Sequence, residues 1–160
     1  MFFCYIRITK HPAMQERLPA NRFENSRYII EYFPDESTVE FLMKDQEIDK
    51  QDVVEMHKVV LGFTQMRPYA TLFKAMDFFS LTTEARIEGS RKHYSVFVVV
   101  QAFVVKNLAQ RLIGNFIMKF STPVKDSRLF ATAEDARGWI AMRLAAELKA
   151  NRERELNLMQ

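Results

Sequence analysis

The sequence predicts an α/β domain built on a mixed, mostly parallel sheet of about five strands with helices packed against it. Three observations lead to this class. The segment from Val98 to Val105 is dense in β-branched residues and apolar on both faces, as interior strands are. A helix pattern follows it directly, and other strand and helix patterns alternate on either side. The chain of 160 residues, 48% of them hydrophobic, fits one domain with a substantial core.

The first half of the chain predicts a hairpin followed by two helices and a strand. Residues 28–33 and 38–43 have strand composition and flank P-D-E-S, which suits a tight turn. The segment D-K-Q-D, residues 49–52, suits the start of a helix that runs to about Thr64. A short strand follows over residues 69–74, and Thr82 or Thr83 then caps the next helix.

The second half predicts two more strand–helix pairs, which completes the order ββαβαβαβα. After the strand at residues 98–105, Asn107 caps a helix that ends near Phe120, before a proline. Its expected buried stripe consists of Leu108, Ala109, Leu112, Ile113, Phe116, Ile117 and Phe120. Residues 127–131 form the last strand, and T-A-E-D, from Thr132, opens a last helix. Right-handed crossovers make the later strands parallel.

Composition divides the chain into a domain and two flanking segments. Residues 1–26 contain two prolines and differ from the rest, so we expect an N-terminal appendage. Residues 27–148 form the domain. Residues 149–160 are polar on all sides and predict a helical tail.

The charge and cysteine content exclude several classes of protein. The 23 basic and 20 acidic residues give a net charge of only +3 and are scattered, which argues against nucleic-acid binding. The single cysteine, Cys4, cannot form an intramolecular disulfide and suits the cytoplasm. No stretch reaches the roughly 18 apolar residues that a membrane span requires.

Three segments resemble the small bacterial domains called STAS-like or SpoIIAA-like. They are K-N-L-A-Q-R-L-I-G-N-F at residues 106–116, followed by F-S-T-P; L-F-A-T-A-E-D-A-R-G-W-I at residues 129–140; and T-T-E-A-R at residues 82–86. The resemblance covers about residues 28–145. It implies a sheet with helices mainly on one face and a non-enzymatic role in binding another protein.

The resemblance also indicates one candidate switch. In the related anti-sigma-factor antagonists, a serine at the start of the helix after the middle strand is phosphorylated. Thr82 and Thr83 hold that place here, but the aspartate-serine-serine-glycine signature is absent, and Lys74 stands where relatives commonly carry an aspartate. A phosphate at a helix N-terminus is electrostatically tolerated. The alternative is that one threonine simply caps the helix.

Two further groups are candidates for a partner surface. Arg111, Asn115 and Lys119 are spaced four apart on the polar side of one predicted helix, where they can receive an acidic partner or phosphate, or form an ordinary solvated face. Phe78 and Phe79 lie between a strand and a helix, where they can mark a contact surface or cover the end of the sheet.

No motif predicts catalysis, a cofactor or a metal. The histidines at positions 11, 57 and 93 share no ligand spacing, and neither a phosphate-binding glycine loop nor a nucleophile motif is present. An enzyme is therefore the least favoured of three hypotheses.

We expect a cytoplasmic interaction module that presents residues 77–86 to a protein partner, with a homodimer as a secondary expectation supported by the nine methionines. The alternative is a small-molecule or lipid-binding domain with an apolar pocket between sheet and helices. That alternative requires a cavity of roughly 300 Å³ or more, whereas an interaction module should be packed solid.

Overall fold

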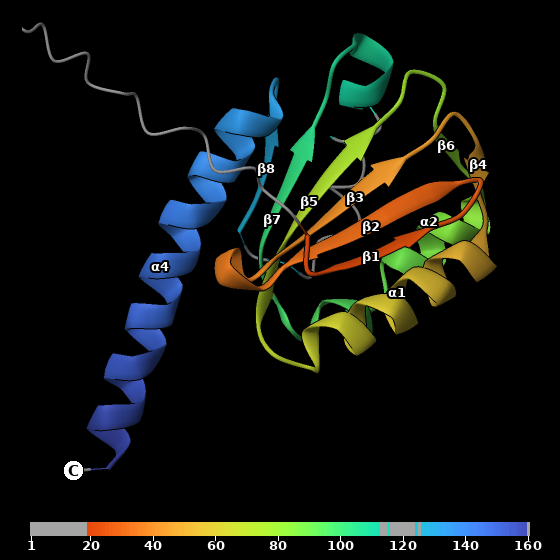
Figure 1. Cartoon of the computed structure of the whole chain (residues 1–160). Helices are drawn as coiled ribbons and strands as arrows, with labels where there is room; N and C mark the ends of the chain where they lie inside the picture. The colour runs from red at the N-terminus through yellow and green to blue at the C-terminus, as the bar shows by residue number, and fades with distance from the viewer. Residues whose placement is uncertain (1–18, 113–114, 116–123, 125, 160) are drawn as a thin grey trace, which may run out of the picture.

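A computed structural model describes residues 19–112, 115, 124 and 126–159, which form a six-stranded mixed sheet with helices on both faces (Figure 1). The spatial order is β1-β2-β3-β5-β7-β8. The first three strands are antiparallel neighbours, and the pairs β3–β5, β5–β7 and β7–β8 are parallel. The expected α/β class is thereby confirmed.

The strands of this sheet are β1 (Asn21–Glu24), β2 (Tyr28–Phe33), β3 (Thr38–Met43), β5 (Tyr69–Ala75), β7 (Val98–Val104) and β8 (Asp126–Phe130). A separate parallel pair consists of β4 (Glu47–Ile48) and β6 (Ser80–Leu81). The helical elements include η1 (Pro34–Glu36), α1 (Lys50–Thr64), α2 (Thr83–Gly89), η2 (Lys92–Ser95) and α4 (Ala133–Leu158).

The sheet begins earlier than the sequence predicted. Strand β1 lies within the segment expected to be an appendage, and it pairs with β2 so that Phe23 is opposite Ile30. The Phe23 ring also stacks on Tyr28, with 5.9 Å between ring centroids. The segment N-R-F-E has one apolar residue and no alternation, so its strand conformation depends on pairing with β2.

The helices cover both faces of the sheet, which corrects the expectation that they lie mainly on one. Tyr28, Ile30 and Phe41 share one face with the α1 residues Met56 and Val60. The opposite face is formed by small and branched residues of the parallel strands and the inner side of α4: Ala70, Leu72, Val100, Ala102, Val104, Ala136, Ile140 and Leu144. The interior strands are apolar on both sides, so both sides require cover.

Strand β7 is an interior strand, as predicted, with β5 on one side and β8 on the other. Val100, Ala102 and Val104 point toward α4 and are buried. Gln101 and Phe103 alternate with them and point to the opposite face, because successive strand residues face opposite sides.

The predicted helix caps are confirmed. The Asp49 carboxylate accepts hydrogen bonds from the backbone N–H groups of Gln51 and Asp52. In turn, the Asp52 carboxylate accepts a hydrogen bond from the backbone N–H of Asp49. The hydroxyls of Thr82 and Thr132 accept from the N–H groups three residues on. These side chains satisfy N–H groups that the helices cannot pair internally.

The structure describes the helix after β7 at residues 108–112 and 115. There, the helix does not bury the face that the sequence predicts. Leu108 and Leu112 are 73% and 62% exposed, whereas Gln110 is buried. The Gln110 side chain accepts from Lys106 N at 2.9 Å and donates to Met76 O at 2.8 Å. These two hydrogen bonds to backbone groups hold the Gln110 side chain, and the helical turn that carries it, toward the interior. Ala109, also predicted to be buried, is exposed, and the remaining members of the predicted stripe lie outside the described residues: Ile113, Phe116, Ile117 and Phe120.

A buried carboxylate joins α4 to the sheet. Glu40 of β3 is only 2% exposed, and its two oxygens accept from Arg137 Nε at 2.7 Å and Nη2 at 2.9 Å. Lys74 of β5 donates to the same carboxylate at 2.6 Å. The second half of α4 continues past this contact and stands clear of the sheet in Figure 1.

We expect Arg137→Met to lower the free energy of unfolding by roughly 2 kcal/mol, because the buried Glu40 carboxylate loses the two charge-assisted hydrogen bonds from Arg137 and keeps the one from Lys74. Urea unfolding measures this. Arg152→Met, at an exposed position on the same helix, is the matched control and should change stability by at most about 0.5 kcal/mol. Equal stabilities of the two variants would show that the Glu40 network does not anchor α4.

Candidate functional site

A cavity of about 240 Å³ lies between the sheet and the layer formed by α1 and α2. Its lining extends from Tyr69 and Val98, where β5 and β7 begin, to Ala75, where β5 ends, and Val105, which follows the last residue of β7. At the strand rise of about 3.3 Å per residue, this is about 20 Å of sheet. The cavity is therefore elongated along the parallel strands.

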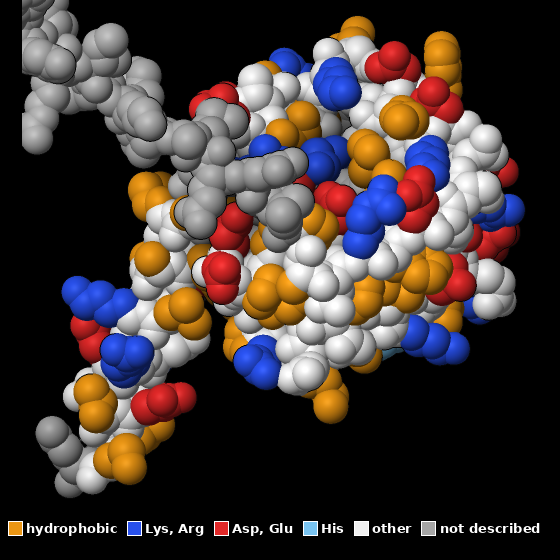
Figure 2. Space-filling model, in the orientation of Figure 1, with side chains coloured by type: hydrophobic (Ala, Val, Ile, Leu, Met, Phe, Trp, Pro, Cys, Tyr) orange, Lys and Arg blue, Asp and Glu red, His pale blue; other side chains and the backbone are white. Residues whose placement is uncertain are grey.

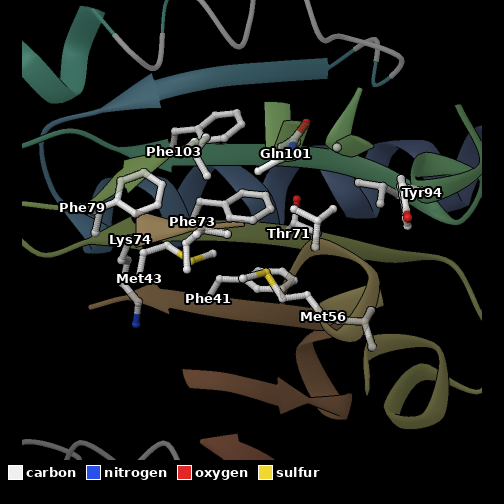
Figure 3. Close-up of a pocket in the computed structure, with 18 of the residues that line it drawn as sticks. Phe41, Met43, Met56, Thr71, Phe73, Lys74, Phe79, Tyr94, Gln101 and Phe103 are labelled. Atoms are coloured by element: carbon white, nitrogen blue, oxygen red, sulfur yellow. The ribbon is translucent and has the colours of Figure 1, made fainter. Parts of the chain in front are cut away.

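Three phenylalanine rings form the floor of the cavity. Phe41, Phe73 and Phe103 occupy matching positions on β3, β5 and β7. The Phe41 and Phe73 rings are 4.5 Å apart, the Phe73 and Phe103 rings are 5.2 Å apart, and both pairs are stacked. Figure 3 shows these rings stacked across the three strands, with Phe79 on one side of the stack and Tyr94 on the other. The floor offers a continuous aromatic surface.

The short strand pair β4–β6 positions helices α1 and α2, which cover the cavity opposite the sheet. Ile48 of β4 immediately precedes the Asp49 cap of α1, and Leu81 of β6 immediately precedes the Thr82 cap of α2. The Thr82 N–H also donates to Ile48 O at 3.0 Å. Because Ile48 and Leu81 are paired, helices α1 and α2 begin side by side. Residues of the pair and both helices line the cavity: Ile48, Val53, Met56, His57, Val60, Leu81 and Ala85.

Most polar groups around the cavity already have partners. Tyr94 Oη donates to Glu88 Oε1 at 2.6 Å, and Ser95 Oγ donates to Lys92 O at 2.9 Å. The Tyr94 hydroxyl lowers the pKa of the buried Glu88 carboxyl, and burial raises the pKa of Tyr94 to about 12. The hydroxyls of Tyr94 and Ser95, which both line the cavity, are thus already paired.

Thr71 is the exception. It lies on the floor of the cavity, on the same face of β5 as Phe73 and two residues before it, and is 3% exposed. Its hydroxyl is the one buried side-chain oxygen without a hydrogen-bond partner in the described part of the chain. Leaving such a group unpaired costs about 1–3 kcal/mol, so this position is suboptimal for stability.

Two titratable side chains of the lining, Lys74 and His57, are respectively turned away from the cavity and disfavoured in the charged form. Lys74 contributes to the lining, but its Nζ is bound to Glu40 on the opposite face, and Figure 3 shows the amine pointing away from the rings. His57 packs edge-on against Tyr94, 4.6 Å between centroids, and against His93 at 5.8 Å. Burial, with a smaller effect of His93, lowers the pKa of His57.

The structure places the residues singled out from the sequence in two regions. Phe79 lines one end of the cavity, while Phe78 is 80% exposed beside it. Thr82 caps α2, and Thr83 is exposed in its first turn. These four residues are thus near the cavity, whereas Arg111 and Asn115 are exposed and border a separate hollow with Val105, Leu129, Phe130 and Ala131. Lys119 lies outside the described residues.

The described residues contain no group of three or more His, Cys, Asp or Glu side chains placed to hold a metal ion. Among the helices that the structure describes, none is both long and apolar enough to cross a membrane. On the face shown in Figure 2, basic and acidic side chains alternate without a large area of one sign.

Sequence reasoning missed the residues that define the cavity floor. Phe41, Thr71, Phe73, Gln101 and Phe103 lie in segments predicted as strands, where they read as ordinary core residues. The available signal was the alternation of large side chains along each strand. Which of these residues meet depends on the register between strands, which no local pattern reports.

We expect Thr71→Val to raise the free energy of unfolding by about 1 kcal/mol, because it removes a buried hydroxyl that has no partner. Thr64→Val is the matched control: Thr64 is also buried, but its hydroxyl donates to Val60 O at 2.9 Å. That variant should lose about 1 kcal/mol. Urea unfolding compares them, and a destabilised Thr71→Val protein would contradict the view that the hydroxyl is unsatisfied.

We expect His57 to make stability fall below about pH 6.5, its ordinary pKa. Because the pKa is lowered in the folded state, the unfolded chain binds more protons in this range, and stability decreases as pH falls. Urea unfolding at a series of pH values between about 7.5 and 5.5 should show this loss. His57→Gln should flatten the dependence, and an unchanged slope in that variant would assign the effect to other groups.

Comparison with known proteins places the chain in one family. No curated protein and no solved structure matches it significantly. A family model matches residues 36–142, which include β3, the parallel strands, the lining of the cavity and the first part of α4. The chain therefore belongs to the family described as a domain of unknown function, DUF7793.

Proposed function

We propose that this domain binds a small, mainly apolar molecule in the cavity between the sheet and helices α1 and α2. The observation that carries the proposal is the cavity itself, lined by Phe41, Phe73, Phe103 and the apolar sides of both helices. Binding, without catalysis, is the proposed role. The sequence predicts such an apolar pocket as the alternative to a protein-interaction module.

The size of the cavity favours a ligand over a packing defect. A volume of about 240 Å³ equals the space of about eight water molecules at about 30 Å³ each. Protein interiors contain few voids larger than one water. The cavity is somewhat smaller than the roughly 300 Å³ at which ligand pockets usually begin, so we expect a small ligand of at most two or three rings, or a short chain.

The chemistry of the lining also favours a ligand. Pockets for small molecules are typically apolar with a few placed polar groups. Here the floor is aromatic, Met43 and Met56 add flexible apolar surface, and Thr71 and Gln101 provide polar groups among them. Methionine adapts its shape to irregular partners at low cost.

We expect the uncharged fluorescent probe phenylnaphthylamine to bind the protein with one-to-one stoichiometry. Ala75→Phe places a ring at the β5 end of the cavity and should raise the Kd about tenfold, or about 1.4 kcal/mol. Ala146→Phe, at an exposed position of α4, is the control and should bind as the natural protein does. Absence of binding to the natural protein, or equal binding by Ala75→Phe, would contradict the proposal.

A second candidate function, binding of a protein partner, is favoured by the exposed apolar side chains near the cavity. Phe78 is 80% exposed, Ile87 of α2 is 60% exposed and Val96 is 68% exposed. An exposed aromatic residue beside a helix start is typical of a contact surface. Residues 77–86 would be presented to the partner, as expected for a STAS-like module, and a second copy of the chain is the simplest partner. The single cysteine supports a cytoplasmic site of action.

If Phe78 mediates self-association, light scattering should give a mass near twice 18.8 kDa for the natural protein. Phe78→Ser should then shift the protein toward the monomer, because an apolar contact is lost. Leu158→Ser is the control, since Leu158 is 87% exposed at the far end of α4. A natural protein that scatters as a monomer at high concentration would exclude the homodimer.

A further inference from the structure

Two polar side chains lie side by side in the cavity with bonding capacity to spare. Thr71 and Gln101 are paired across β5 and β7. They lie on the same face as the Phe73–Phe103 pair and precede it by two residues. Figure 3 shows them next to each other, between the stacked phenylalanines and Tyr94. The Thr71 hydroxyl has no partner, and the Gln101 amide bonds only Ser127 Oγ, through its oxygen at 3.4 Å. The Gln101 NH₂ group is therefore unpaired within the described structure.

We infer that the ligand of this cavity is uncharged and carries a hydrogen-bond acceptor, such as a carbonyl oxygen, that lies against Thr71 and Gln101. This inference rests on the proposed binding function and specifies its ligand. A hydroxyl and an amide NH₂ both donate hydrogen bonds, and one carbonyl oxygen can accept two. Buried polar groups in native proteins are nearly always paired, so an acceptor at this position would pair the buried Thr71 hydroxyl, and the half-buried Gln101 amide supplies a second donor beside it.

The state of the charged residues in the described lining favours an uncharged ligand. Among the charged lining residues, Lys74 is bound to Glu40 on the opposite face, and Arg86 is exposed and already engaged in an interaction. His57 is the remaining titratable group on α1, and burial disfavours its charged form. Burying an unpaired carboxylate or ammonium group costs several kcal/mol, so a charged ligand would bind weakly here.

The spacing along the strands gives the ligand its shape. Phe73 and Phe103 follow Thr71 and Gln101 by two residues on the same face, which is about 7 Å of strand. A compact apolar group attached directly to the acceptor reaches the rings over this distance. An aromatic ketone or a similar neutral carbonyl compound fits both requirements.

Three naphthalenes substituted at the same ring carbon test the inference. Acetylnaphthalene carries the acceptor, isopropenylnaphthalene has the same shape without it, and naphthoate is the anion. Each is titrated against bound phenylnaphthylamine. We expect acetylnaphthalene to bind the natural protein about fivefold more tightly than its hydrocarbon analogue, as one hydrogen bond of about 1 kcal/mol provides. Naphthoate should bind at least about tenfold more weakly than acetylnaphthalene.

Variants assign the preference to specific side chains. Thr71→Val and Gln101→Leu should each reduce the preference for acetylnaphthalene over its hydrocarbon analogue about twofold, because the two donors share the fivefold effect. Thr64→Val, whose hydroxyl bonds within α1, should keep the preference of the natural protein. Because the readout is a ratio of two affinities in one protein, a change in stability does not imitate it.

The outcomes separate the two proposals. If all probes bind but the preference is unchanged in both Thr71→Val and Gln101→Leu, the acceptor is wrong and the binding function stands. If naphthoate binds as tightly as acetylnaphthalene, the ligand is not restricted to neutral molecules and the inference is overturned. If phenylnaphthylamine and the naphthalenes all fail to bind, the proposed function is overturned together with the inference.

Discussion

The constraint on which the rest of this structure depends is that β7 is an interior strand that must be covered on both faces. Its residues alternate strictly, with Val100, Ala102 and Val104 on one face and Gln101 and Phe103 on the other. Because neighbouring strands are in register with it, this alternation extends to β5 and gives the sheet one face of small residues and one of aromatic residues. The two faces therefore need different kinds of cover.

The small-residue face is closed and the aromatic face is not. Ala70 and Ala102 allow α4 to approach the sheet through Ala136 and Ile140, and the ion pair between Glu40 and Arg137 fixes the helix at the sheet. On the other face, the stacked rings are bulky, and α1 and α2 are positioned by the short β4–β6 pair rather than by close packing on β7. A cavity remains between the rings and the helices.

The cavity also concentrates features that are unfavourable for stability alone. A buried threonine without a hydrogen bond, an imidazole whose charged form is disfavoured and exposed apolar side chains occur around one site. Proteins tolerate such features where function requires them. The ligand and partner hypotheses share this location, because Phe78 is exposed on the loop whose next residue, Phe79, lines the cavity. Binding of a ligand and binding of a protein partner would therefore involve adjacent residues of one loop.

The sequence by itself determined the elements whose cause is local. The strands at 28–33, 38–43, 69–75 and 98–104 follow from composition, and the caps Asp49, Thr82 and Thr132 follow from residue type and spacing. Tertiary structure decided what depends on distant residues: strand β1, which needs β2; the helices on both faces; the exposure of Leu108; and the contact of Glu40 with Arg137, 97 residues away. It also decided the site, because a one-residue change of register would move Thr71 or the phenylalanines to the other face. Local patterns specify a strand, but only pairing between strands specifies which side chains meet.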